Sequence, residues 1–197
     1  TVSVLTYIGL NVCLTFFMII LKHSIEPIPN TFARLANASS VLGYEEKGFV
    51  LVQAAISSRD GEIEFSGGLG QENLGIHHQT RSGGKKVPMY SADSYFDKFV
   101  KSKGPVNILQ IDVEGWDFDV LFGASSVLDR TQYLEFEYHA TGPWGGYHLP
   151  DTVHLLDHKG FTCYWSGKSK LWRLRDATST FITLIMIGQM LRVYIGH

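Results

Sequence analysis

The chain has 197 residues, of which 45% are hydrophobic, 18% charged and 13% aromatic, and this predicts one globular domain with a substantial core. The formal net charge of −2 leaves no basic surplus for a phosphate backbone, so nucleic acid is not expected as a partner. Cys13 and Cys163 form no disulfide or zinc pattern, and we expect reduced thiols and no metal site.

Apolar runs alternate with helical patterns in the order typical of an α/β domain. The first part predicts a strand and a helix, the end of a second strand, and a helix opened by Pro29. A buried strand, a hairpin through a turn and a glycine-rich loop come next. These elements cover Val4 to Ile8, Leu14 to Lys22, Ser24 to Glu26, Pro29 to Ala36, Phe49 to Ala55, Ile63 to Phe65 and Gly67 to Lys86.

The second part predicts a sheet that is mostly parallel, with helices on both faces and an antiparallel hairpin at its end. Its central unit is a strand, an acidic turn and a helix in which Phe118, Leu121, Phe122 and Leu128 are expected to be buried. Ser91 is expected to cap one helix, and Gly160 to end another. The elements cover Val87 to Tyr90, Ala92 to Lys101, Val106 to Ile111, Trp116 to Leu128, Tyr133 to His139, Asp151 to Lys159, Phe161 to Trp165 and Lys170 to Leu174.

Both ends of the chain are uncharged and apolar. Val2 to Leu21 would span a bilayer as one helix, and a strand, a turn at Gly9 and a helix fit the same residues equally well. Ala177 to Leu191 is too short for a confident span and suits a core or interfacial helix better. We therefore assign residues 1–175 to the domain and 176–197 to an apolar tail of unassigned role. A cytoplasmic location is the default expectation, and membrane association is the alternative.

Polar residues at strand ends are the candidates for a ligand site, because open α/β sheets bind ligands at the carboxyl ends of their strands. The carboxylate of Glu26 can accept hydrogen bonds from both hydroxyls of a ribose, although a solvent-facing loop residue would have the same spacing. Glu114 lies near a helix N-terminus, where a carboxylate also has a purely capping role. In chain order the candidates are Gly9 with Asn11, Glu26, Gln53, Asp112 with Glu114, and Glu137 with His139.

The segment Ile108 to Gly115, which reads ILQIDVEG, and the VLFGA of Val120 to Ala124 carry a family resemblance. They resemble the lysine-containing KIDVEG block and the following VLKGA of the FkbM-like family of S-adenosylmethionine-dependent methyltransferases. The resemblance covers most of residues 4 to 174. Shorter matches in the same order are Ile25 to Pro27, Ala54 to Ser57, Ser91 to Tyr95 and Leu134 to Glu137.

The resemblance implies a Rossmann-like class I methyltransferase domain that uses S-adenosylmethionine to methylate a hydroxyl of a small molecule or carbohydrate. Such a transfer needs alignment of the reacting groups and a base for the hydroxyl proton. The candidate bases are Asp112, Glu137 and His139. The residues expected to hold the cofactor are Gly9, Asn11, Glu26, Gln53, Ala54, Asp112 and Glu114.

The first motif departs from the family pattern. The family has Asp-x-Gly-Ala-Asn-x-Gly where this chain has Tyr7 to Cys13, so a carboxylate and a close-approach glycine are replaced. The alternative interpretations are a degenerate member of the fold that serves as a non-catalytic binding or structural module, and a membrane-anchored protein.

Overall fold

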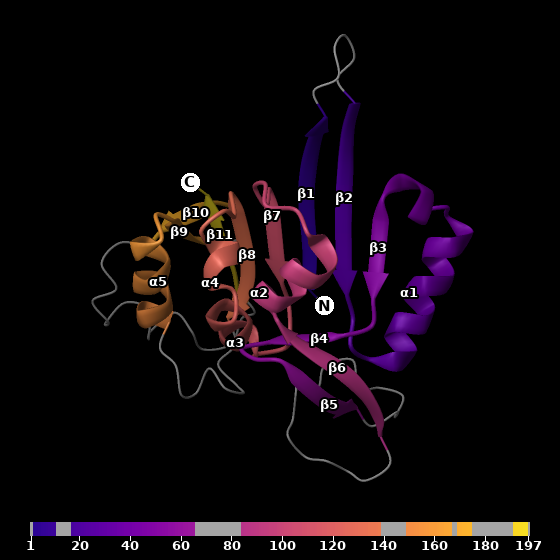
Figure 1. The fold of residues 1–197 in the computed structure, drawn as a ribbon. Coiled ribbons are helices and arrows are strands. Elements are labelled where there is room, and N and C mark those ends of the chain that lie inside the picture. The colour runs from indigo at the N-terminus through magenta and orange to yellow at the C-terminus, as the bar shows by residue number, and fades with distance from the viewer. Residues whose placement is uncertain are drawn as a thin grey trace.

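A computed structural model shows a mixed α/β fold and describes residues 2–10, 17–65, 84–138, 149–166, 169–174 and 191–196 (Figure 1). Most of the predicted glycine-rich loop, together with Cys13, lies outside these residues. The elements are β1 (Val2–Leu10), β2 (Phe17–Ile25), α1 (Pro29–Val41), η1 (Glu45–Lys47), β3 (Phe49–Val52), β4 (Ala55–Ser57), β5 (Gly61–Phe65), β6 (Lys85–Ser91), α2 (Ala92–Tyr95), η2 (Phe96–Val100), β7 (Ile108–Ile111), α3 (Asp117–Phe122), α4 (Ser125–Leu128), β8 (Tyr133–Tyr138), α5 (Leu149–His158), β9 (Thr162–Ser166), β10 (Leu171–Arg173) and β11 (Leu191–Gly196).

The main sheet has eight strands in the order β10-β9-β11-β8-β7-β1-β2-β3, and β4-β6-β5 form a separate three-stranded sheet. Among the described strands of the main sheet, only the pairs β2/β3 and β7/β8 are parallel. The prediction of a mostly parallel sheet is therefore wrong. Because β1 and β11 each run against both of their neighbours, β2, β3, β7, β8 and β9 nevertheless point in the same direction.

The N-terminal segment is a β-hairpin, in which β1 and β2 pair from Val2 with Ile25 to Leu10 with Phe17. The predicted helix from Leu14 to Lys22 is wrong for its described part, because Phe17 onward belongs to β2. An uncharged segment with many β-branched residues can form a helix or a strand. Here the segment pairs along the whole of β1 and is therefore a strand. Val2 to Leu21 is thus not one helix. Among the described residues, no helix has both the length and the apolar character needed to cross a bilayer.

The described part of the apolar tail has a place in the sheet. Strand β11 lies between β8 and β9 and is antiparallel to both. The predicted terminal hairpin is confirmed, because β9 and β10 are antiparallel neighbours. Residues 191–196 therefore complete the sheet beside β8.

The helices α2 to α5 and η2 contribute buried side chains to one hydrophobic core against the main sheet, in which Leu109 and Ile111 of β7 and Leu134 and Phe136 of β8 are almost completely buried. Ser91 caps α2 as predicted, since its Oγ accepts a hydrogen bond from the Ser94 amide at 3.1 Å. Gly160 follows α5 with a φ of 88°, which confirms its predicted role.

Three predicted elements are interrupted. The apolar run of residues 49–55 divides between two sheets as β3 and β4, and β5 pairs with β6, so the predicted hairpin is wrong. The helix expected over residues 92–101 continues beyond Tyr95 as the π-helix η2. The helix expected over residues 116–128 breaks at Gly123 into α3 and α4, and Phe122 is 68% exposed rather than buried.

The break at Gly123 is held by hydrogen bonds with Asp93 at the start of α2. The Gly123 carbonyl accepts a hydrogen bond from the Asp93 amide at 3.0 Å. The Asp93 carboxylate in turn accepts hydrogen bonds from the amides of Ser126 and Val127 at 3.1 and 3.0 Å, so it caps the short helix α4. This links α2, α3 and α4.

The substitution Gly123→Ala is expected to lower the free energy of unfolding by about 1–3 kcal/mol, the usual cost of overpacking. A Cβ at this position would clash with the carbonyl oxygen of Ser57 and lie 3.0 Å from the Cα of Ser58. Urea unfolding followed by circular dichroism measures the change. Gly61→Ala is the matched control, since its Cβ would meet only the Met89 side chain at 3.5 Å, and equal losses for both variants would contradict the clash.

His23 on β2 is expected to make stability depend on pH. It is buried, its Nδ1 lies 3.0 Å from the Tyr95 hydroxyl, and burial lowers its pKa below the ordinary value of 6.5. The unfolded chain then binds more protons than the folded one, so this contribution to stability is complete above pH 6.5 and is lost as the pH falls below it. As the pH falls across this range, the free energy of unfolding should decline less for His23→Asn than for the unsubstituted chain. Unfolding titrations at each pH measure this, and an identical pH dependence in the two chains would refute the role of His23.

Candidate functional site

One row of paired residues crosses five strands of the main sheet. Val52, Ile25, Val2, Ile111 and Phe136 are consecutive partners across β3, β2, β1, β7 and β8. Four of these strands run in the same direction, and the residues that follow the row on them are Gln53, Glu26, Asp112 and Glu137. We call these four residues the rim. The structure thus places polar residues from four strands in one row near this edge of the sheet.

The register sets the spacing along the rim. Asp112 and Glu137 follow directly paired residues, so their backbones lie about one strand spacing, or about 4.8 Å, apart. Glu26 and Asp112 are separated by β1, which places their backbones about 10 Å apart. The rim is therefore an acidic pair on β7 and β8, a gap at β1, and a second polar pair on β2 and β3.

Glu26 and Gln53 form the second polar pair. Glu26 is buried, its Oε1 accepts a hydrogen bond from the Ile28 amide at 2.9 Å, and its own amide donates to the Val52 carbonyl at 3.1 Å. Gln53 Oε1 accepts from Lys85 Nζ at 3.3 Å. Within the described part of the chain, the buried Nε2 of Gln53 has no hydrogen-bond partner, which is an unusual cost for an amide. The amide therefore needs a partner that the described residues do not supply.

The acidic turn after β7 has an unusual backbone. Glu114 has a φ of 53° and Gly115 a φ of 91°, so two consecutive residues are left-handed. This conformation costs a non-glycine residue of the order of 1 kcal/mol or more, and such strain concentrates at functional sites. The turn presents Asp112 and Glu114, both partly exposed, before α3 begins at Asp117.

Asp117 connects this turn with β8. The side chain is completely buried, Oδ2 accepts a hydrogen bond from the Gly115 amide at 3.3 Å, and Oδ1 accepts one from the Glu137 amide at 3.2 Å. The carboxylate thereby holds two parts of the rim in a fixed relation. The sequence analysis did not identify Asp117, although an acidic residue in the first turn of a helix directly after the acidic turn was a visible signal.

Four other predicted site residues are not part of the rim. Gly9 pairs with Met18 in the hairpin, so its backbone is about 23 Å along β1 from the rim end at Val2. Ala54 lies next to the rim, but its side chain is completely buried in the hydrophobic core. Asn11 and His139 lie outside the described residues. The structure therefore brings together the predicted residues of β2, β3, β7 and β8 and not those of β1.

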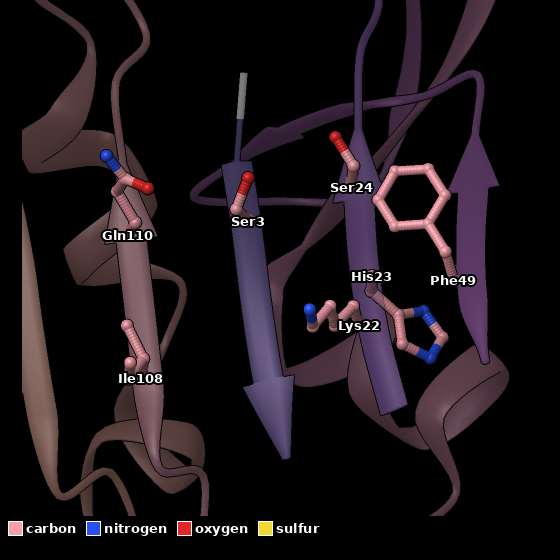
Figure 2. A pocket seen from close by; sticks show the side chains of 7 residues that line it. All are labelled: Ser3, Lys22, His23, Ser24, Phe49, Ile108 and Gln110. Atoms are coloured by element: carbon pink, nitrogen blue, oxygen red, sulfur yellow. The ribbon is translucent and has the colours of Figure 1, made fainter. Parts of the chain in front are cut away.

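A hollow of about 230 Å³ lies beside the rim on the sheet face opposite the helical core. Figure 2 shows Ser3 between Gln110 and Ser24 on neighbouring strands, with Lys22 and Ile108 further from the rim. Phe49 closes the hollow at β3, and His23 is its remaining lining residue. Over β1, β2 and β7, helices therefore cover only one face of the sheet within the described residues, contrary to the prediction.

The comparisons with known proteins agree on the kind of domain. The family model described as the methyltransferase FkbM domain matches residues 7–163. Hexuronic acid methyltransferase AglP of Haloferax volcanii is 29% identical over 116 residues, which are 58% of this chain and 46% of that protein. The chain thus matches about half the length of this curated relative. No solved structure matches significantly.

The substitution Asp117→Asn is expected to lower the free energy of unfolding by about 1–3 kcal/mol. An amide oxygen replaces only one of the two carboxylate acceptors, so one of the amides of Gly115 and Glu137 is left facing an NH₂ group. Chemical unfolding measures the loss. Asp129→Asn is the control, because Asp129 is 64% exposed in its ion pair with Lys159 and should cost less than about 1 kcal/mol. An Asp117→Asn variant with an unchanged free energy of unfolding would contradict the bridging role.

Proposed function

The chain belongs to the methyltransferase FkbM domain family, and from this premise we propose that it transfers a methyl group from S-adenosylmethionine to a hydroxyl of a carbohydrate. The rim is the observation that carries the proposal, because it gathers carboxylates and an amide from four strands at one edge. The printed name of the Haloferax volcanii relative, a hexuronic acid methyltransferase, supports a sugar-related acceptor.

The strand order supports a Rossmann-like class for this domain. From β1 the sheet extends through β2 to β3 on one side and through β7 to β8 on the other, so the order reverses at the centre. Ligands of doubly wound sheets bind at such a reversal, beyond the carboxyl ends of the strands. The reversed direction of β1 is a departure from that class.

Glu26 and Gln53 fit the adenosine part of the cofactor. The buried carboxylate of Glu26 is suited to accept hydrogen bonds from the ribose hydroxyls, and the unpartnered Nε2 of Gln53 is suited to donate to a base nitrogen. When bound, S-adenosylmethionine supplies an activated methyl group on its sulfonium. The protein then has to hold the two reactants in line and exclude competing groups.

Asp112 and Glu137 are the candidates for the proton of the acceptor hydroxyl. Their backbones are neighbours across β7 and β8, and Asp117 holds the Glu137 amide and the acidic turn together. One carboxylate orients the hydroxyl and the other accepts its proton as the bond to carbon forms. Glu114 contributes a further negative group from the same turn.

A second candidate function is a non-catalytic module of the same family. Gly9 of the altered first motif lies far from Glu26 and Asp112 along β1, and this observation favours the alternative. Cofactor binding distinguishes the two functions.

The first expected outcome is saturable binding of S-adenosylmethionine and S-adenosylhomocysteine to the purified chain in calorimetric titration. Glu26→Gln should weaken both by about tenfold, since a charged acceptor of two hydrogen bonds becomes a neutral one. Glu46→Gln, on the exposed η1, is the matched control and should bind as the unsubstituted chain does.

Two other results of the titration would contradict parts of the proposal. A folded sample that binds neither compound would overturn the proposed methyl transfer and favour the non-catalytic module. Binding that Glu26→Gln leaves unchanged would remove Glu26 from the cofactor site.

A further inference from the structure

We propose that the hollow beside the rim binds the carboxylate-bearing ring of an acidic sugar, so that the acceptor is a uronic acid rather than a neutral sugar. The inference rests on the proposed methyl transfer and deepens it by naming the class of acceptor. It assigns a role to the face of the sheet that faces away from the helical core.

The polar groups of the hollow are suited to a carboxylate. Ser3, Lys22, Ser24 and Gln110 supply one ammonium group, two hydroxyls and one amide from β1, β2 and β7. Within the described part of the chain, none of these four side chains takes part in a hydrogen bond or ion pair. Hydrogen bonds from such donors to a carboxylate are shorter and stronger than those between neutral groups.

In the described strands, the register partners of Lys22 are Leu5 and Phe49, and neither is acidic. Glu135 is the partner of Gln110 on β8 and shares its face of the sheet. Three strand spacings separate β8 from β2, which is about 14 Å. This exceeds the screening length of about 8 Å in physiological salt. The rim residues Glu26 and Asp112 lie four residues, or about 13 Å, along the strands from Lys22 and Ile108. The positive charge of Lys22 therefore dominates at the end of the hollow away from the rim.

The size and apolar parts of the hollow suit a single sugar ring. Its volume of about 230 Å³ is below the 300 Å³ or so at which pockets for drug-sized ligands begin. Phe49 flanks it on β3, and Ile108, which is 38% exposed, lies on β7. An aromatic ring and an aliphatic side chain offer apolar surface to the C–H groups of a sugar.

The hollow is also continuous with the rim. Gln110 and Ser24 lie one residue before Ile111 and Ile25, and Asp112 and Glu26 follow directly. The distance from Gln110 to Asp112 along the strand direction is therefore about 7 Å. A ring held in the hollow by its carboxylate can present a hydroxyl to the acidic pair of the rim.

The test is a calorimetric titration of the purified chain with D-glucuronate and with D-glucose, each in the presence of S-adenosylhomocysteine. Glucuronate should bind at least about tenfold more tightly than glucose. Lys22→Gln, which replaces the charge of an exposed side chain by a neutral amide, should remove most of this preference. Lys86→Gln, in an exposed ion pair with Glu62 on the other sheet, is the control that should retain it.

S-adenosylmethionine also carries a carboxylate, so its binding is measured on the same variants. Unchanged binding of S-adenosylmethionine by Lys22→Gln together with loss of the glucuronate preference supports the proposal. Weaker binding of S-adenosylmethionine by this variant would overturn it, because the hollow would then hold the donor. Equal binding of glucuronate and glucose would overturn it as well.

The two proposals fail in different ways. A chain that binds S-adenosylmethionine and methylates glucose as well as glucuronate would retain the proposed function and overturn the acidic-sugar site. A chain that binds no S-adenosylmethionine but prefers glucuronate through Lys22 would retain the site and overturn the methyl transfer. The variant Gln110→Leu provides an independent check and should weaken glucuronate binding in the same direction.

Discussion

The double pairing of β1 is the constraint on which the arrangement of this protein depends. Residues Val2 to Leu5 pair with β2 on one side and with β7 on the other, both antiparallel. This strand therefore joins two parallel pairs, β2/β3 and β7/β8, in a register that aligns their carboxyl ends. If the register of β1 slipped by one residue, the polar groups of the rim would no longer lie in line and the faces of β1 would exchange.

The acidic side of the rim is stabilised by buried hydrogen bonds and stores backbone strain at the same time. Glu114 and Gly115 adopt left-handed conformations, and the buried Asp117 carboxylate accepts hydrogen bonds from the amide of Gly115 in this turn and from the amide of Glu137 in β8. The core around α3 and α4 supports this geometry, because Gly123 allows α3 to approach β4 and Asp93 caps α4. A strained turn on a well-packed support is the usual arrangement of a preorganised site.

The two faces of the main sheet differ in what they contact. One face packs against helices and contributes Leu109, Ile111 and their neighbours to the hydrophobic core. The other presents Lys22, Ser3, Ser24 and Gln110 at the hollow beside the rim. Alternation of side chains along β7 separates the two, since Ile108 and Gln110 face the hollow while Leu109 and Ile111 are buried. Core packing on one face and the side chains that line the hollow on the other can therefore vary independently in the same strands.

Local sequence patterns are sufficient to predict the elements of the central region and most of the rim. Periodicity and turn chemistry are local properties, and they predict the strand, acidic turn and helix around Asp112. They also predict the polar residues Glu26, Gln53 and Glu137 near strand ends. Long-range contacts set the direction of β1, the strand state of residues 17–25 and the insertion of β11, because each strand pairs with segments that are distant in the chain. The burial of Asp117 between two segments and the open hollow at Lys22 have the same origin, since both depend on which strands become neighbours.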